Sequence, residues 1–192
     1  MKVLLSALVL AAAPAFAATA VVGQPAPAFS VTDTSGKAVS LADFKGKTVV
    51  LEWVNPGCPY VRKHYDSANM QATQKGAAGQ GVVWLAVNST AQEHYDYKKP
   101  ADMAAWRQSQ KAAATHTLMD SDGKIGKAYG ARTTPHLYVV DAKGTLAYAG
   151  GIDDKATANA ADVKTAKNYV NAALGDVLAG KAVAQAVTRP YG

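Results

Sequence analysis

The sequence predicts an α/β fold in which helices flank a central mixed sheet. Segments with the pattern of strands alternate along the chain with segments of helical periodicity, as they do in α/β domains. Two of the predicted strands are apolar over most of their length, which is typical of strands buried on both faces. Hairpin signals near both ends of the chain make part of the sheet antiparallel. The length of 192 residues suits a single domain.

The first half of the chain begins with a hairpin and continues into the sheet. Asp33–Lys37 has the composition of a hairpin turn, and the β-branched and aromatic run after Lys47 indicates a buried strand that Asn55-Pro56-Gly57 ends. Helical periodicity follows as far as Gly76. The expected elements are a hairpin (29–32 and 38–41), a short turn (41–47), a buried strand (48–54), a helix (58–75), a second buried strand (81–88) and a polar loop (89–99).

The second half returns to antiparallel pairing and closes with a helix. Pro100 suits a first helical turn, Asp141–Gly144 has turn composition, and the last segment has apolar residues at helical spacing. The expected elements are a helix (100–114), a short strand (116–119), a short helix (123–129), a hairpin (136–140 and 145–149) and a last helix (162–179).

The N-terminus has the three parts of a signal peptide. Lys2 supplies the positive charge, 3–13 is an apolar stretch too short to span a membrane, and Ala15-Phe16-Ala17 matches a cleavage site. We therefore expect residues 1–17 to be removed and 18–192 to form one exported, periplasm-type domain. The net charge of +6 is scattered rather than clustered, which does not favour nucleic acid as a partner.

The chain has a single cysteine, Cys58. Exported proteins normally pair their cysteines, so a lone one is either buried and inert or a free reactive thiol. Cys58 lies where a buried strand turns into a helix, and the unpaired N–H groups of a helix N-terminus stabilise a thiolate. Pro59 suits the first helical turn because it lacks an N–H, and the basic residues 62–64 would further favour the anion. We expect a functional thiol.

Four segments carry a resemblance to a known family. Leu51–Tyr60 resembles the active-site segment of the redoxin group, which includes the AhpC/TSA (peroxiredoxin) family and the thiol–disulfide oxidoreductases of the thioredoxin superfamily. Gly23–Phe29 is similar to the N-terminal segment of that group, Leu41–Leu51 to its approach to the first core strand, and Tyr129–Asp141 to the segment that holds the thioredoxin cis-proline. The resemblance covers residues 21–180. It implies a thioredoxin-like fold with an N-terminal hairpin extension, and a redox function.

The resemblance also implies site residues, with departures from the family pattern. Val61 stands where a Cys-x-x-Cys motif has its second cysteine, so an external thiol must resolve any intermediate. Asn55 stands where peroxiredoxins have Thr or Ser, and Arg132 is the candidate for their arginine, with Arg62 second. In relatives with this active-site segment a further cysteine often follows Pro-Tyr-Gly, and we leave open whether one follows Gly192. The residues expected to shape the site are Trp53, Pro56, Gly57, Pro59, Thr134 and Pro135, with Thr134–Pro135 as a cis peptide.

Three other side chains have alternative interpretations. His64 and His136 would activate the thiol, bind a soft metal such as Cu(I) with Cys58, or be ordinary histidines. We expect no metal and no cofactor, because the second thiol of Cu(I) carriers is missing. Glu52, inside a buried strand, would shuttle protons to the thiol or pair with Lys or Arg.

These residues predict an exported, antioxidant-type oxidoreductase that works with one cysteine. Cys58 would attack a peroxide or the disulfide of a client protein, and an external thiol would resolve the product. The alternative is a non-catalytic binding module that carries client proteins or Cu(I) at the Cys58–Pro135 face. A third possibility is a degenerate redoxin in which Cys58 is unreactive. The sequence identifies neither the oxidant nor the reductant.

Overall fold

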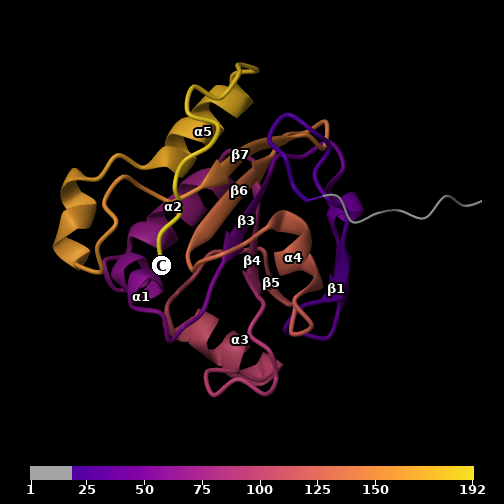
Figure 1. Ribbon diagram of the computed structural model, residues 1–192, viewed down its shortest axis with the longest axis vertical. Helices are drawn as coiled ribbons and strands as arrows, with labels where there is room; N and C mark the ends of the chain where they lie inside the picture. The colour runs from indigo at the N-terminus through magenta and orange to yellow at the C-terminus, as the bar shows by residue number, and fades with distance from the viewer. Residues whose placement is uncertain (1–18) are drawn as a thin grey trace, which may run out of the picture.

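The protein is described by a computed structural model over residues 19–192 (Figure 1). The helices are α1 (Pro59–Asp66), α2 (Asn69–Ala78), α3 (Pro100–Ser109), α4 (Lys124–Tyr129) and α5 (Tyr169–Leu178), with two short 3-10 helices, η1 (Leu41–Phe44) and η2 (Ala160–Thr165). The strands are β1 (Ser30–Thr32), β2 (Ala38–Ser40), β3 (Val49–Trp53), β4 (Val83–Asn88), β5 (His116–Met119), β6 (His136–Val140) and β7 (Leu146–Gly150).

A five-stranded mixed sheet forms the centre of the fold, in the order β5-β4-β3-β6-β7. β3 pairs in parallel with β4 and antiparallel with β6, so that Trp53 lies opposite both Val87 and His136. β1 and β2 form a separate antiparallel hairpin. The predicted mixed sheet and N-terminal hairpin are therefore confirmed. The last residue of β3, the first of β6 and the last of β7 meet at one end of the sheet, which we call the site end.

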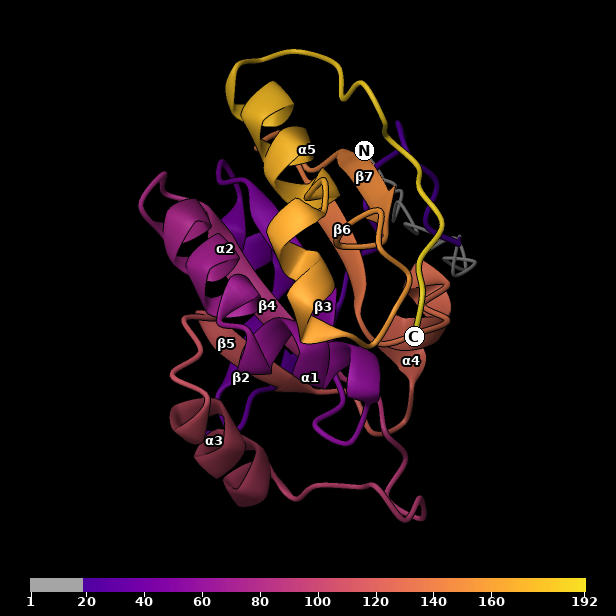
Figure 2. The same cartoon turned by 90° about the vertical axis from the view of Figure 1, so that its left-hand side faces the viewer.

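Two hydrophobic cores cover the two faces of the sheet. Figure 2 shows α2 and α5 lying across one face, and α1 continues this layer toward the site end. Its core includes Val61, Met70 and Leu174 against Val50 and Trp84. The hairpin, η1 and α4 cover the opposite face, on the right in Figure 1. Glu52 and Trp53 follow each other in β3 and so point to opposite layers, which places one on each side of the site end.

The helix predicted over 58–75 is in fact two helices. α1 ends at Asp66 and α2 begins at Asn69, because Ala68 takes a left-handed conformation with φ of 59°. The side chain of Ser67 bonds back to the carbonyl of His64, as serine does where a helix ends. The break therefore separates α1, which follows Cys58, from α2, which packs on the sheet.

The last predicted helix is also interrupted, and α3 is shorter than expected. Residues 160–165 form η2, and α5 begins only at Tyr169, because Asn168 pairs with Asp153 and its side chain caps the N-terminus of α5. α3 ends at Ser109, and Lys111 takes a positive φ of 52° two residues later. Both differences lie at chain segments that turn back to meet distant residues.

The signal peptide predicted at residues 1–17 lies outside the described residues. Among residues 19–192, none of the helices combines the length and apolar character that crossing a bilayer requires.

Candidate functional site

Cys58 lies at the site end, where β3 gives way to α1. It is the N-cap residue of α1, with an extended backbone (φ −73°, ψ 125°), and Pro59 is the first helical residue. Its backbone N–H donates to the Asn55 carbonyl at 3.0 Å, which closes the turn between strand and helix. The thiol is half-buried. The first turn of α1 leaves unpaired N–H groups beside it, so the positive end of the helix dipole faces this position.

The turn before Cys58 is held by Asn55. Its side-chain oxygen accepts the backbone N–H of Gly57 at 2.9 Å, which leaves the amide NH2 free to donate elsewhere. Gly57 admits the carboxylate of Asp96 from the loop after β4, since a Cβ on Gly57 would lie 2.9 and 3.0 Å from its two oxygens. Asp96 was not among the predicted site residues. The polar loop that contains it was predicted, but its approach to Gly57 was not.

Thr134 provides the partner of the thiol. The Sγ atom of Cys58 lies 2.9 Å from the Thr134 carbonyl oxygen, a hydrogen bond in which the thiol is the donor. The Thr134–Pro135 peptide is cis, as the resemblance implied. This contact joins the start of α1 to the segment that leads into β6, and it brings together Cys58, Thr134 and Pro135 as expected from the sequence.

A cavity of about 370 Å³ opens beside these residues. Trp53, Asn55, Arg132 and Thr134 line it, and the Arg132 side chain is solvent-exposed. On its floor, the Trp53 indole N–H donates to the Ser89 hydroxyl at 3.0 Å. The structure therefore groups the predicted residues Trp53, Asn55, Arg132 and Thr134 around one open space next to the thiol.

Glu52 is a fully buried carboxyl on the helical side of β3. Its Oε1 accepts from the Tyr65 hydroxyl at 2.9 Å, and its Oε2 accepts from the Trp84 indole at 2.7 Å and the Gln74 amide at 3.0 Å. Burial raises the pKa of Glu52 to about 7, and these three hydrogen bonds only partly offset that effect. The predicted alternative of pairing with Lys or Arg is wrong, because all three partners are neutral.

The basic residues after Cys58 are engaged by other groups. Lys63 and His64 are buried, and the Nζ of Lys63 lies 3.6 Å from Asp153. His64 accepts the Asn69 amide at Nδ1 and contacts the Tyr191 hydroxyl through Nε2 at 3.0 Å, and burial lowers its pKa to about 4. The exposed residue Arg62 faces Asp66. The expectation that residues 62–64 favour the thiolate is therefore not supported by their contacts.

His136 is the first residue of β6 and is also buried. Its ring stacks near Tyr138, and its Nδ1 lies 3.1 Å from the Tyr138 hydroxyl. Burial, with a smaller effect of Arg132, lowers the pKa of His136 to about 4. Across residues 19–192, no three His, Cys, Asp or Glu side chains converge in a way that would hold a metal ion.

The C-terminal residues reach the same place, which the sequence did not predict. Tyr191 is buried, with its hydroxyl donating to the carboxylate of Asp153. Gly192 lines the cavity beside Thr134. No periodicity marks this segment, and Asp153 lies 38 residues before Tyr191 in the chain. The signal that could have placed Tyr191 and Gly192 here is the Pro-Tyr-Gly motif noted in the sequence analysis.

Comparison with known proteins gives matches to redox families. The model of the AhpC/TSA family matches residues 22–149. The thiol-disulfide oxidoreductase ResA of Bacillus thuringiensis subsp. konkukian is 28% identical over 132 residues, which are 65% of this chain and 66% of ResA. The chain therefore spans just under two thirds of the length of that relative.

Solved structures share the fold. A hypothetical protein from Sinorhizobium meliloti 1021 has a TM-score of 0.75 at 24% identity, over 91% of this chain and 93% of that one. The thioredoxin domain of a thiol-disulfide oxidoreductase from Bacteroides vulgatus has a TM-score of 0.52 at 26% identity, over 67% of this chain and 86% of that domain. The predicted thioredoxin-like fold is confirmed.

Proposed function

Because the chain belongs to the AhpC/TSA family, we propose that it is a thiol-dependent oxidoreductase whose reactive group is Cys58. The observation that carries this proposal is the position of the thiol. Cys58 is the N-cap residue of α1, and its thiol donates to the carbonyl of Thr134 at 2.9 Å, a residue that lines the open cavity. A cysteine kept only for packing would be expected deep in the core instead.

The reaction uses one cysteine of this chain. With a disulfide, the Cys58 thiolate attacks one sulfur, a new S–S bond forms, and the other sulfur leaves as a thiolate with the electron pair of the broken bond. With a peroxide, the thiolate attacks one oxygen, the O–O bond breaks, and the leaving alkoxide or hydroxide takes up a proton. The product in that case is a sulfenic acid on Cys58.

An external thiol completes either reaction. Val61 occupies the place of a second cysteine, one turn into α1, so the mixed disulfide is resolved by a small-molecule or protein thiol that attacks the partner's sulfur and releases Cys58 as a thiolate. For a sulfenic acid, one external thiol forms a mixed disulfide and releases water, and a second regenerates the Cys58 thiol.

Asn55 and Arg132 orient the oxidant in this proposal. The amide NH2 of Asn55 remains free to donate because its oxygen is bonded to the Gly57 N–H. The exposed guanidinium of Arg132 lines the same cavity and would stabilise the negative charge on the leaving oxygen or sulfur. Glu52, with a pKa of about 7, is a buried group able to take up and release a proton near neutral pH.

We further propose that the protein is exported. The charged residue, apolar stretch and small-residue site at 1–17 support this proposal. Disulfide-bearing client proteins are found in such compartments, and this makes them the first substrates to test.

The experiment is to trap the intermediate on the folded chain. The reduced protein is mixed with hydrogen peroxide or with a small disulfide, and intact-mass measurement follows Cys58. We expect a mixed disulfide or a sulfenic acid in proportion to the oxidant, and none in Cys58→Ser. A thiol that stays unmodified by both oxidants would contradict the oxidoreductase and leave the binding module and the unreactive redoxin as the alternatives.

A further inference from the structure

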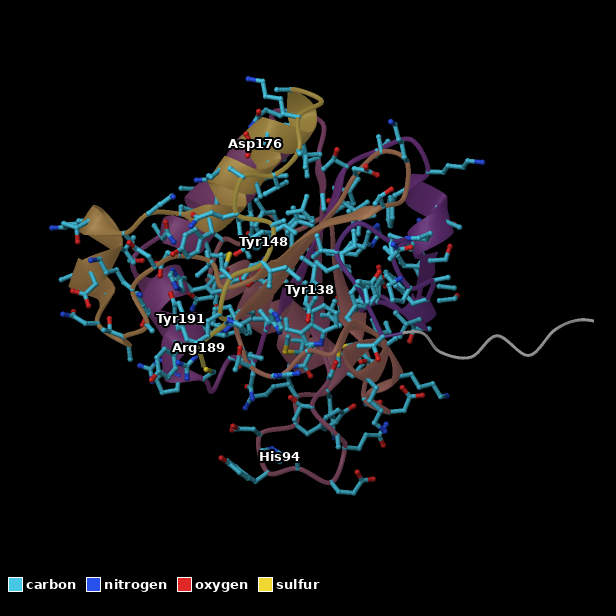
Figure 3. The ribbon with its side chains drawn as sticks, turned by 45° about the horizontal axis from the view of Figure 1, so that its top comes forward. His94, Tyr138, Tyr148, Asp176, Arg189 and Tyr191 are labelled. Carbon is cyan, nitrogen blue, oxygen red and sulfur yellow. The ribbon has the colours of Figure 1, made fainter. Side chains whose placement is uncertain are left out.

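The C-terminal segment lies along the edge of the sheet and ends beside Cys58. We call residues Val187–Gly192 the strap. Val187 bridges to Ala149 in parallel, and the N–H of Thr188 donates to the Ala149 carbonyl at 3.1 Å. In Figure 3 the strap runs past Tyr148, and Arg189 and Tyr191 lie together next to α1. The strap therefore covers the open edge of β7 and then continues to the site end.

Two glycines at the end of β7 let the strap approach closely. A Cβ on Gly150 would overlap the Thr188 hydroxyl and lie 2.7 Å from the Thr188 carbonyl, and a Cβ on Gly151 would lie 3.0 Å from the Arg189 carbonyl. The Thr188 hydroxyl lies 2.6 Å from that of Tyr148 and accepts the Gly151 N–H at 3.1 Å. The absence of side chains at Gly150 and Gly151 thus lets the main chain of the strap lie in direct contact with the end of β7.

Tyr191 anchors the strap in a buried polar pocket. Its hydroxyl donates to Asp153 and contacts His64 at 3.0 Å and Lys63 at 3.3 Å. Its ring packs edge-on against Tyr60, with the ring centroids 5.7 Å apart. Removing this hydroxyl would leave the Asp153 carboxylate, which has one oxygen already without a hydrogen bond, less well satisfied. Removing the Tyr191 hydroxyl should therefore loosen the strap without changing its main chain.

Gly192 lies on the residues that position the thiol. A Cβ on Gly192 would overlap the Thr134 carbonyl, lie 2.8 Å from the Thr134 nitrogen and lie 2.9 Å from Thr133. The same Thr134 carbonyl contacts the Sγ atom of Cys58. Gly192 therefore occupies the space in which another main chain would pair with Thr134.

Cavities flank the strap on both sides. One is the cavity of about 370 Å³ beside Asn55 and Arg132, and the other, of about 510 Å³, lies by Tyr60 and Asp153. Thr133 and Gly192 line both cavities, so the end of the strap is the wall between them. Displacing the strap would join the two into one groove along Thr133 and Thr134, whose carbonyl contacts the Cys58 thiol.

We propose that the strap occupies the groove through which an extended segment of a disulfide-bearing protein reaches Cys58. Such a client must displace the strap, whereas a peroxide or other small oxidant reaches the thiol through the open cavity. This inference rests on the proposed function of Cys58. It makes extended polypeptide segments a substrate class of the site and makes the strap their built-in competitor.

The test compares one small and one large probe on the same thiol. The small probe is iodoacetamide. The large probe is an unstructured peptide whose cysteine carries 5-thio-2-nitrobenzoate, which leaves as a coloured thiolate when Cys58 forms a disulfide with the peptide. The variants are Tyr191→Phe and a chain that ends at residue 186, and the matched control is Tyr95→Phe, which removes a hydroxyl from an exposed loop.

We expect Tyr191→Phe and the shortened chain to react with the peptide at least tenfold faster than the unaltered chain, with iodoacetamide rates within about twofold. Tyr95→Phe should match the unaltered chain with both probes. Amide hydrogen exchange at Ala149 and Gly151 should accelerate in Tyr191→Phe, since both N–H groups are bonded to the C-terminal segment.

Two distinguishable results would overturn the proposal that the strap restricts access of clients to Cys58. Equal ratios of peptide rate to iodoacetamide rate in all folded variants would show that the strap does not restrict clients, while the proposed function would stand. A Cys58 that reacts with neither probe in any variant would remove the proposed function, and the strap would fall with it.

Discussion

Replacing Glu52 by glutamine should change how stability depends on pH. The carboxyl is fully buried among neutral donors, and burial raises its pKa from 4.5 to about 7. The folded state therefore holds a proton on Glu52 over a range of pH in which the unfolded chain has released it. Glutamine keeps the size of the side chain and one acceptor for Trp84 and Gln74, and its NH2 would donate to the Tyr65 oxygen.

The sign and size follow from linkage. Since the pKa of Glu52 is higher in the folded state, its contribution to stability is full below about pH 4.5 and is lost as the pH rises through about 7. Between pH 5 and pH 8 the loss is on the order of 2 to 3 kcal/mol, because each pKa unit corresponds to about 1.4 kcal/mol.

The assay is urea unfolding at pH 5 and pH 8, followed by tryptophan fluorescence. The difference in unfolding free energy between the unaltered chain and Glu52→Gln should favour the unaltered chain by about 2 kcal/mol more at pH 5 than at pH 8. Glu93→Gln, on an exposed loop, serves as the control and should show no such change. A Glu52→Gln difference that is the same at both pH values would refute the protonated, buried carboxyl.

Other predictions concern the buried histidines, the buried ion pair and the turn before the thiol. Burial lowers the pKa of His64 and His136 to about 4, so the contribution of each to stability is full above about pH 6.5 and is lost as the pH falls through about 4. His136→Gln should reduce the dependence of the unfolding free energy on pH over this range in the urea assay, and an unchanged dependence would contradict the prediction. Lys63→Met removes the cation beside the buried Asp153 carboxylate and should destabilise the fold by about 3 to 5 kcal/mol, with partial recovery in the double variant Lys63→Met/Asp153→Leu. Thermal unfolding at neutral pH measures both variants, and a mild effect of Lys63→Met alone would contradict the pairing. Asn55→Ala removes the acceptor of the Gly57 N–H and should lower the free energy of unfolding by about 1 kcal/mol. It should also slow the reaction of Cys58 with peroxide, measured by stopped flow, and equal rates in the variant and the unaltered chain would contradict a role for Asn55 in the site.

The sheet was predictable because its signals are local. β3 and β4 are apolar runs bounded by turn residues, and the hairpins have turn sequences of their own. The position of Cys58 follows directly from the end of β3, as does its place at the start of α1. These features depend on neighbours in sequence, which a pattern of residue types records.

The remaining features depend on distant residues. The break at Ala68 has only a weak local marker in the neighbouring Ser67, and alanine itself is a good helix former that seldom takes a positive φ. Lys63 and His64 look like surface residues of a helix until Asp153 and Tyr191 arrive from the far end of the chain. The approach of Asp96 to Gly57 and of Gly192 to Thr134 is likewise long-range.

The reactivity of Cys58 in the folded chain decides whether its thiol is functional. Iodoacetamide alkylation is timed at neutral pH in the folded protein and again in concentrated urea, with Cys58→Ser as the blank. The proposed function predicts that Cys58 is alkylated in the folded state, because the half-buried thiol lies at the site end next to residues that line an open cavity. Alkylation in urea with none in the folded state would contradict a reactive thiol and leave Cys58 as a residue that only packs.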